Sequence, residues 1–453
     1  MNILHVITGM QKAAGTSVFC GEVCNQLVAQ GHEVTLATIS GQSEYSLDPR
    51  IRVIAISDLV GVKSWSGRKE DNNSNLQLVT PTPTNQKVQT PSSTSTYDLI
   101  HIHALWQPIL HRVSSWARTN HIPVIWSPHG MITPWAMNNK KWKKYLAWYL
   151  YQKRDLQSAA LLHATAQSEV EDIQRMGLKN KVMIAPLGVN LPDLRSRTRS
   201  RSTMEDSSLQ PSTFNVQRST KTLLFVSRVQ RKKGLPMLLD AWAKLPSEIK
   251  KNWYIRIVGP DQDNHIAELK SQCDRLGLTY LDETEIIKDE SGRAVVPSTA
   301  VNKIEPPSST STSSSTFSYD VVFVGPKFDN DLQQEYANAD LFVLPTHSEN
   351  FGSVVIEALA HNVPVICTKG APWKDLEDYN CGYWVDISVD ALADALGKTI
   401  SMSPEERREM GLNGHALVYT KYTWKAVGDT IAKVYQKIIG QVDRVENLEE
   451  RKN

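Results

Sequence analysis

The feature that most constrains the fold is a repeated alternation of short apolar runs with amphipathic helical patterns. Continuous apolar runs such as ILHVI (3–7) and DLFVLPT (340–346) are typical of strands that are buried on both faces. Helical patterns separate these runs, and Gly31 stands where the first helix is expected to end. Because parallel strands joined by helical crossovers have this pattern, we expect an α/β fold.

The alternation occurs in two series, which predicts two doubly wound, Rossmann-like domains facing a cleft. We expect the first domain over 1–190 and the second over 221–403, joined by a low-complexity linker at 191–220. Helices are predicted over 404–440, and a mixed-charge tail over 441–453 is expected to fray. Ligands of such folds bind at the carboxyl ends of the strands, so we expect the chemistry there.

Three stretches rich in Ser, Thr, Pro and Asn interrupt this pattern. They cover about 64–96, 195–220 and 286–318, and they hold too few large apolar side chains to offset the entropy of ordering. The first and the third share a related Pro-Ser-Ser-Thr-Ser-Thr sequence near their ends. We therefore predict disordered inserts in surface loops, with a regulated or binding segment as the alternative interpretation.

Charge and cysteine content narrow the class of protein. Lysine and arginine total 50 against 48 aspartates and glutamates, and this net charge of +2 argues against a nucleic-acid-binding protein. We expect neither a secretory signal nor a transmembrane helix, and the five cysteines favour a cytoplasmic location. Cys20 and Cys24 share one face of the first helix. Because two thiols are too few for structural zinc, we expect them to pack in the core.

The most informative segment is LPTHSENFGSVVIEALAHNVPV. In it Glu349 follows a strand, and a helix begins after Gly352 and carries Glu357 in its second turn; Asn350 and Phe351 complete the loop. A helix start offers free N–H groups and a partial positive charge, which suit a diphosphate or sugar oxygens. Gly352 permits close backbone approach, and the Glu357 carboxylate can accept hydrogen bonds from ribose hydroxyls.

A basic segment, SRVQRKKG, directly follows the first strand of the second series. It is expected to point Arg228 and one of three further cations toward the cleft, namely Arg231, Lys232 or Lys233. Two cations at a strand end can neutralise a leaving pyrophosphate. The two segments together therefore predict a diphosphate site in the second domain.

Together, SRVQRKKG and ENFGSVVIEALA resemble the retaining glycosyltransferases of family 4, group 1 enzymes of GT-B fold. The stretch SPHGMITPWAMNNKKWKKYLAWYLYQKRDL (127–156) resembles a subgroup that acts in polysaccharide or lipopolysaccharide assembly. The resemblance covers the chain apart from the three inserts. It implies transfer of a hexose from a nucleotide diphosphate sugar, UDP or GDP, to a glycan or lipid-linked acceptor with retained configuration. It also implies that the helices at 404–440 cross back to the first domain.

The resemblance implies a role for each of the second-domain residues. Arg228 and Lys233 would bind the donor's diphosphate and stabilise charge on the departing nucleotide. Glu357 would hold the ribose. Glu349, with the backbone of 350–352, would hold the hydroxyls of the donor sugar.

In the first domain, the resemblance implies that His129 faces the donor sugar and that Gly15 shapes a loop where acceptor and diphosphate meet. The family often has Gly-Gly in this loop, whereas Ala14 precedes Gly15 here. This change costs little if only Gly15 needs a positive φ. His103 is a candidate acceptor contact, but His101 shares its strand face, so packing is the alternative for one of the two.

Asp261-Gln262-Asp263 mimics an Asp-x-Asp metal motif. It follows Gly-Pro at a strand end, and we interpret it as a turn and helix start, where aspartate is a common capping residue. We therefore expect no required metal and no cofactor beyond the nucleotide sugar as co-substrate.

The stretch 138–156 combines lysines with aromatic residues, and two interpretations stay open. In one, a basic aromatic helix lies on the inner face of an anionic membrane. In the other, the aromatic side chains pack inward and the lysines are solvated. The residues are Lys140, Lys141, Lys143 and Lys144 with Trp142, Tyr145, Trp148 and Tyr149, and helical spacing groups the last three.

Three alternatives stand beside the leading function. One is a synthase with a soluble acceptor, of the sucrose or glycogen type. Another is a nucleotide-sugar epimerase of GT-B fold, which would convert its substrate without an acceptor. The third is a non-catalytic sugar-nucleotide binder, which the intact set Glu349, Glu357, Arg228 and Lys233 argues against.

Overall fold

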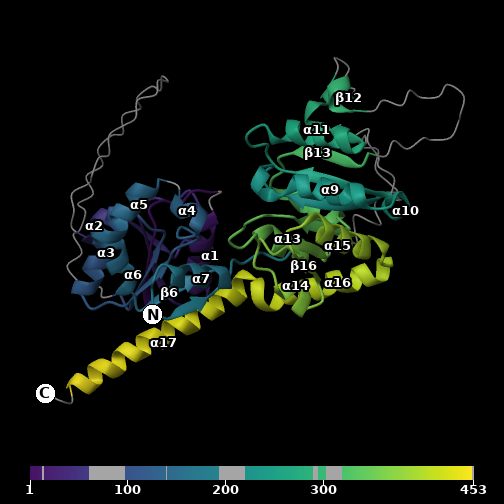
Figure 1. Cartoon of the computed structure of the whole chain (residues 1–453). Helices are drawn as coiled ribbons and strands as arrows, with labels where there is room; N and C mark the ends of the chain where they lie inside the picture. The colour runs from purple at the N-terminus through teal and green to yellow at the C-terminus, as the bar shows by residue number, and fades with distance from the viewer. Residues whose placement is uncertain are drawn as a thin grey trace, which may run out of the picture. The chain divides into compact units, whose positions relative to one another are not determined.

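The computed structural model describes residues 1–12, 15–60, 97–138, 140–192, 220–288, 294–302 and 319–450. Contacts divide the chain into two compact units, each built around its own sheet (Figure 1). Unit 1 comprises Met1–Ala164, Glu169–Ala185 and Gly428–Asn453, and unit 2 comprises Thr165–Ser168 and Pro186–Val427. The first predicted insert and nearly all of the second lie outside the described residues.

Unit 1 is a seven-stranded parallel sheet with the order β3-β2-β1-β4-β5-β6-β7. Its strands are β1 (Asn2–Val6), β2 (Glu33–Thr38), β3 (Arg52–Ala55), β4 (Leu99–His103), β5 (Val124–Ser127), β6 (Leu161–Ala164) and β7 (Val182–Ile184). The helices are α1 (Gly15–Ala29), α2 (Ile56–Val60), α3 (Pro108–Thr119), α4 (Pro134–Asn138), α5 (Lys141–Ala147), the π-helix η1 (Trp148–Gln152), α6 (Lys153–Gln157) and α7 (Gln167–Arg175). Because the chain leaves β1 and β4 in opposite directions, right-handed crossovers place α1 and α3 on opposite faces.

Unit 2 repeats this plan with the strand order β10-β13-β9-β8-β14-β15-β16, all parallel. Its strands are β8 (Lys221–Val226), β9 (Trp253–Val258), β10 (Tyr280–Asp282), β13 (Val321–Gly325), β14 (Leu341–Leu344), β15 (Val365–Thr368) and β16 (Gly382–Val385). The helical elements are η2 (Arg231–Lys233), α9 (Leu235–Lys244), α10 (Ser247–Lys250), α11 (His265–Leu276), η3 (Glu283–Glu285), α12 (Asp329–Asn338), α13 (Ser353–Ala360), α14 (Asp375–Asp378), α15 (Val389–Ser401), α16 (Pro404–Leu417) and the π-helix η5 (Val418–Tyr422). The doubly wound α/β prediction is thus confirmed for both sheets.

The predicted start of the third insert, at about 286, is too early in the sequence. A short antiparallel pair, β11 (Ile287–Lys288) with β12 (Ala294–Val295), and the turn η4 (Ser298–Ala300) fall inside 286–318. The reason is that Ile286, Val296 and Val301 pack against the unit 2 core, so this part buries apolar surface after all. The Ser/Thr-rich remainder, 303–318, lies outside the described residues.

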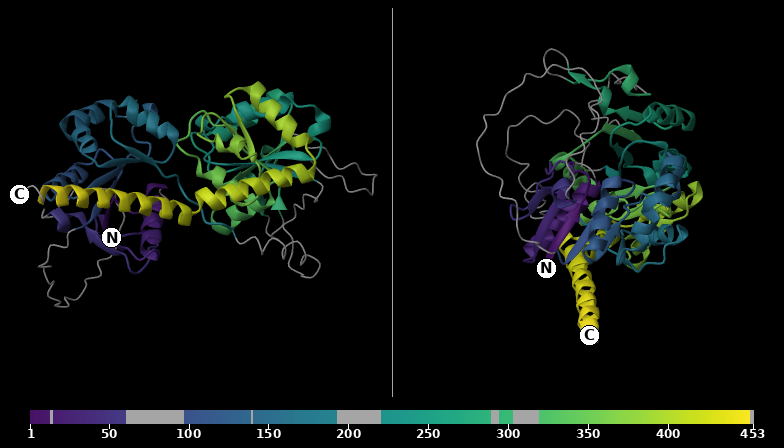
Figure 2. Two further views of the ribbon diagram at one scale, coloured as in Figure 1. Left: turned by 90° about the horizontal axis from the view of Figure 1, so that it is seen from below. Right: turned by 90° about the vertical axis from the view of Figure 1, so that its left-hand side faces the viewer.

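Helix α17 (Trp424–Glu450) continues as one helix through most of the residues for which a frayed tail is predicted (Figure 2). Its first turn, to Val427, belongs to unit 2, and the part from Gly428 onward belongs to unit 1. Ile431 and Tyr435 on this part are fully buried. Within the part of the chain that is described, no helix has both the length and the apolar character needed to cross a membrane.

Candidate functional site

The strand order of unit 2 reverses between β8 and β14, and the predicted cations and carboxylate meet at the carboxyl end of these two strands. Arg228 lies two residues beyond β8, Lys233 ends η2, and Glu349 lies in the loop after β14. The Lys233 ammonium donates a hydrogen bond to the Glu349 carboxylate, and the two side chains are only 9% and 22% exposed. Arg231 instead pairs with Glu268 on α11. Of the three cations left open by the sequence, Lys233 is the one that meets Glu349.

The backbone around this ion pair allows no side chain at one critical position. Gly234 has φ +71°, and a Cβ there would lie 1.9 Å from the carbonyl oxygen of Pro345 at the end of β14. The loop after β14 is held in return, because the backbone N–H of His347 donates to the Lys232 carbonyl at 2.9 Å. The close approach of η2 to β14 therefore fixes where Lys233 and Glu349 can meet.

Positive charge exceeds negative charge at this edge. Lys232 is half-buried, and burial lowers the pKa of its ammonium from the ordinary 10.5; nearby Glu349 acts against this, while Lys233 and Arg228 add to it. Arg228 is exposed and donates a weak hydrogen bond of 3.4 Å to Gln262. Three cations facing one carboxylate leave an edge suited to a polyanion such as a diphosphate.

Helix α13 begins beside the ion pair. Gly352, with φ +81°, precedes its first turn. Phe351 is buried against Trp373, ring centroids 5.0 Å apart, and the Trp373 indole N–H donates to the Phe351 carbonyl at 2.6 Å. Asn350 donates through Nδ2 to the Thr165 hydroxyl at 3.0 Å. The Phe351 side chain thus anchors the loop in the core. Only the backbone of Phe351 is available for the predicted contact with the donor sugar.

Glu357 lies one turn into α13 and is half-buried. Burial raises the pKa of its carboxyl above the ordinary 4.5, whereas hydrogen bonds from Tyr336 and Ser353 act in the opposite direction. The Tyr336 hydroxyl, itself fully buried, donates to Glu357 Oε2 at 2.7 Å. The carboxyl is therefore held in one orientation by its neighbours.

The carboxyl edge of unit 1 has a different chemistry, because five histidines gather there. His163 Nε2 lies 2.8 Å from the Ala185 carbonyl, which can only accept, so His163 is protonated at Nε2 and accepts at Nδ1. The Ser127 hydroxyl then donates to His163 Nδ1 and accepts from His101 Nε2, both at 2.6 Å. His101 Nδ1 in turn accepts from the Tyr435 hydroxyl at 2.5 Å. These partners fix both histidine tautomers.

A second row of histidines runs from β1 to the residue after β5. His5 Nδ1 lies 3.0 Å from His103 Nε2, and His103 Nδ1 lies 3.0 Å from His129 Nε2. His103 is fully buried with both ring nitrogens bonded, so the acceptor contact predicted for it does not fit its position. His129, in contrast, is half-buried and has a strained backbone with φ +51°.

Burial is the main cause of the pKa shifts in this group. It lowers the pKa of His5, His101 and His129 below the ordinary 6.5, and it lowers the pKa of His163 to about 4. Neighbouring imidazoles add to the effect because two charges at this distance would repel. These four rings are therefore neutral at pH 7.

Gly15 begins α1 and is exposed. It does not have a positive φ, so a left-handed backbone is not the reason for a glycine at this position. Ala14 lies outside the described residues.

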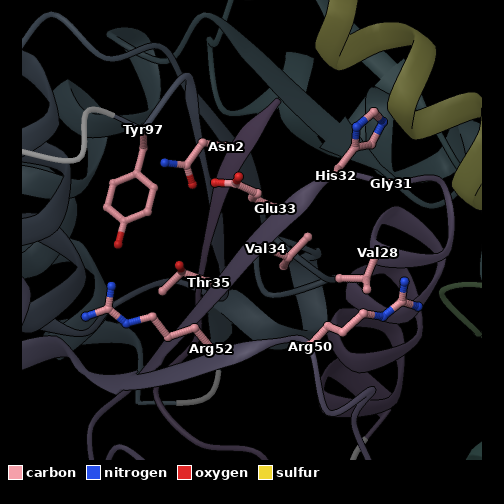
Figure 3. A pocket seen from close by; sticks show the side chains of 10 residues that line it. All are labelled: Asn2, Val28, Gly31, His32, Glu33, Val34, Thr35, Arg50, Arg52 and Tyr97. Carbon is pink, nitrogen blue, oxygen red and sulfur yellow. The ribbon is translucent and has the colours of Figure 1, made fainter.

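A cavity of about 450 Å³ in unit 1 lies at the opposite, amino end of the strands (Figure 3). It is lined by Asn2, Val28, Gly31, His32, Glu33, Val34, Thr35, Arg50, Arg52 and Tyr97, none of them a predicted site residue.

The interpretation of Asp261-Gln262-Asp263 as a helix start is confirmed. Asp261 Oδ1 accepts hydrogen bonds from the backbone N–H groups of His265 and Ile266, at 2.9 and 3.2 Å. Asp263 has φ +61°, and α11 begins two residues later. The carboxylate of Asp261 is therefore used by the backbone at the start of α11.

Two family models match the chain: Glycosyltransferase Family 4 over residues 13–192 and Glycosyl transferases group 1 over residues 315–416. Sucrose-phosphate synthase from Thermosynechococcus elongatus superposes with a TM-score of 0.60 at 18% identity, covering 97% of this chain and 100% of that one. Anabaena Alr3699/HepE in complex with UDP and glucose superposes with a TM-score of 0.58 at 15% identity, covering 96% and 100%.

Among curated proteins, D-inositol 3-phosphate glycosyltransferase of Corynebacterium jeikeium is 27% identical over 224 residues, 48% of this chain and 44% of that protein. The chain spans less than half the length of the curated relatives it matches. The fold is GT-B, with two Rossmann-like domains. The chain belongs to glycosyltransferase family 4, group 1.

Sequence reasoning missed two of the five histidines of this group. It singled out His101, His103 and His129, but not His5 or His163, which come from β1 and β6. A signal was present, since His5 lies within the apolar run ILHVI as His101 lies within LIHIH. Only the strand order, which places β1 beside β4, shows that these rings meet.

Proposed function

We propose that this protein is a retaining hexosyltransferase that uses a nucleoside diphosphate sugar and acts in cell-surface polysaccharide biosynthesis. The acceptor in this proposal is a hydroxyl of a glycan or of a lipid-linked sugar. The observation that carries it is the Lys233–Glu349 ion pair at the switch point between β8 and β14, with Lys232 and Arg228 adding positive charge. Folds of this kind bind nucleotides at such a switch point.

In this proposal Arg228 and Lys233 contact the diphosphate and stabilise the charge that develops on the leaving nucleotide. Glu349 and the backbone N–H groups at the start of α13 hold the hydroxyls of the sugar, and Glu357 holds the ribose. The lysine pairs with the carboxylate at the edge of the site, so each orients the other before the donor binds. One structural neighbour, Anabaena Alr3699/HepE, was solved in complex with UDP and glucose, which makes UDP the first nucleotide to test.

A thermal-shift panel of UDP, GDP, ADP and their sugars tests the donor site. A ligand that binds only the folded chain raises its Tm by mass action, so we expect a shift with one nucleotide family and little with the others. Lys233→Gln should abolish that shift. Arg231→Gln is the matched control, because Arg231 belongs to the same turn but pairs with Glu268 instead. An unchanged shift in Lys233→Gln would contradict the assignment.

Product analysis separates the alternatives. The donor identified by the panel is incubated with and without glycan and lipid-linked acceptors, and the anomeric configuration of any product is read by NMR. We expect transfer only with an acceptor and with retained configuration. Conversion of the nucleotide sugar alone would favour the epimerase, and transfer to a free sugar phosphate would favour the soluble-acceptor synthase.

The proposal of a lipid-linked acceptor is based on the exposed side chains of α5 and η1. Trp142, Leu146, Tyr149 and Leu150 are 53–76% exposed, and Tyr145 is 43% exposed. Trp148 is buried instead, so it does not share the face predicted for it. Inward packing of the aromatic residues is thus wrong for all of them but Trp148. Exposed aromatic and aliphatic side chains among lysines suit an anionic membrane surface, which we propose as their partner.

Vesicle sedimentation tests this surface. We expect the chain to sediment with vesicles containing phosphatidylglycerol, to be released by salt, and to bind neutral vesicles weakly. The double variant Trp142→Ala, Tyr149→Ala should lose most binding. Tyr419→Ala is the control, because Tyr419 is similarly exposed at 64% but lies in unit 2. No sedimentation at low salt would rule out the membrane as partner.

A further inference from the structure

Two thiols and one imidazole converge in the core of unit 1. His5 lies on β1, and Cys20 and Cys24 lie one turn apart on α1. All three side chains are fully buried. A ring nitrogen of His5 and the two Sγ atoms all lie within 4.8 Å of one another.

One atom of this group lacks a partner. His5 Nδ1 bonds to His103, but His5 Nε2 is buried and has no hydrogen-bond partner within the part of the chain that is described. A buried, unpaired nitrogen of this kind is unfavourable, because it has lost its contact with water and gained no hydrogen bond in return. The His5 ring lies next to two sulfurs and interacts with that of Cys20; thiols are weak hydrogen-bond partners but strong metal ligands once deprotonated.

We propose that His5 Nε2, Cys20 Sγ and Cys24 Sγ bind a Zn²⁺ ion. Imidazole and thiolate are the ligands that zinc prefers. Two thiolates balance the charge of a divalent ion, and a neutral assembly is the least costly one to bury. Three protein ligands leave a fourth position for a water molecule or an anion. The sequence argument for core packing counted only the two thiols and could not include His5.

A neighbouring combination, His5 with His101 and His103, is a weaker candidate. Both ring nitrogens of His101 already bond to Tyr435 and Ser127. Both ring nitrogens of His103 bond to His5 and His129. A metal ion there would have to break these bonds, whereas at the two cysteines it would use the nitrogen that is unpaired.

Zinc at this position would also orient the outer histidines. A metal-bound Nε2 leaves the His5 proton on Nδ1, where it donates to His103 Nε2. His103 then carries its proton on Nδ1 and donates to His129 Nε2. His129 is left with its N–H on Nδ1. The ion would thus fix all three tautomers without touching His129.

Metal analysis of the full chain tests the site. After expression with zinc and removal of loosely bound ions, we expect about one zinc per chain by mass spectrometry. Cys20→Ser and Cys24→Ser should each lose most of it. Cys273→Ser is the control, because Cys273 is equally buried but lies on α11 in unit 2. A wild-type chain that neither holds zinc nor takes it up on incubation would overturn the proposal, as would unchanged zinc in both variants.

Cobalt substitution covers the case in which the serine variants fail to fold. Co²⁺ in the wild-type chain should give the intense near-ultraviolet absorption of thiolate coordination, and its absence would also overturn the proposal. Neither readout depends on transfer activity. A chain that binds zinc but no nucleotide would refute the proposed function and support this site. A chain that binds a nucleotide but no zinc would support the proposed function and refute this site.

Discussion

The carboxyl edges of the two sheets are built on the same plan and carry opposite chemistry. In unit 2, the edge between β8 and β14 holds three cations and a carboxylate. In unit 1, the edge around β1 and β4 holds histidines that hydrogen-bond to one another and that burial keeps largely uncharged. The doubly wound fold decides where a site can lie, and the side chains at the switch point decide what it can bind.

The difference has a physical consequence. A charged, partly exposed edge attracts a polyanion. Its stability changes with pH only in the range where its own charged groups titrate. A buried histidine network binds no polyanion, yet it becomes unstable as soon as acid forces charge into it.

Removing the carboxylate of the charged edge should have the largest effect. Glu349→Ala is expected to lower transfer by about 10²–10³-fold, the size seen when one stabilising group of an active site is lost. The circular dichroism spectrum should be unchanged, because Glu349 is partly exposed and lies in a loop. Glu268→Ala, which removes a carboxylate from another ion pair nearby, should leave the rate close to that of the wild type. Wild-type turnover in Glu349→Ala would refute the site.

Acid should unfold the histidine-rich unit first. The pKa of His163 is about 4 in the folded chain and 6.5 as the ordinary value, so between these pH values the unfolded chain binds a proton that the folded chain does not. Stability from this group is complete above pH 6.5 and falls by about 1.4 kcal/mol per pH unit toward pH 4. His101 and His129 pack against it, and burial lowers the pKa of both rings, so they act in the same direction.

Urea unfolding at pH 7, 6 and 5 measures this loss. The free energy of unfolding should fall steadily over this range in the wild type, and the slope should be shallower in His163→Gln, which cannot take up the proton. Glu268 in unit 2 should contribute nothing to this slope, because its pKa of about 2 keeps its carboxylate ionised from pH 7 to pH 5. A flat profile in the wild type would show that the histidines are not held neutral.

The tight approach of η2 to β14 predicts a smaller, steric effect. Gly234→Ala places a methyl group against the Pro345 carbonyl, whereas Gly277→Ala, at nearly the same φ, meets nothing within 4 Å. Both variants incur the cost of about 1–2 kcal/mol for a left-handed alanine. Gly234→Ala should lose about 2 kcal/mol more. Equal losses in calorimetry would mean that the contact is not needed to hold the ion pair.

The smallest effect is expected where α17 joins the histidine network. Tyr435→Phe removes the hydroxyl that donates to His101 Nδ1 and leaves this nitrogen unpaired, at a cost of about 1–3 kcal/mol. Tyr419→Phe removes an exposed hydroxyl and should change stability by less than about 0.5 kcal/mol. If chemical unfolding gives the two variants the same stability, the tyrosine does not support the network.

Sequence alone could predict the larger strands and the charged edge, because both depend on local patterns. Apolar runs marked β1, β8 and β14, and the family motifs brought Lys233 and Glu349 into one site. The strands β3, β6, β7 and β10 were not predicted, since β7 has only three residues and the other three each include a polar or charged side chain that interrupts the apolar run. The ordered start of the third insert was missed because isolated residues such as Val301 bury surface that composition does not reveal.

The neutral edge could not be predicted, because it is assembled from five segments far apart in the chain. His5, Ser127, His163 and Tyr435 become neighbours only through the strand order and the return of α17. No spacing along the sequence links them. The same reason hid the third ligand of the proposed zinc site, which lies on β1 while the two thiols lie on α1.

Calorimetric titration with UDP and GDP tests whether the charged edge of unit 2 binds the donor while the histidine edge of unit 1 does not bind its diphosphate. For the nucleotide that binds, Lys233→Gln should raise the Kd by about 10-fold or more, as loss of a charge-assisted bond implies. His163→Gln should leave the Kd within about twofold of the wild type. An unchanged Kd in Lys233→Gln would contradict the account.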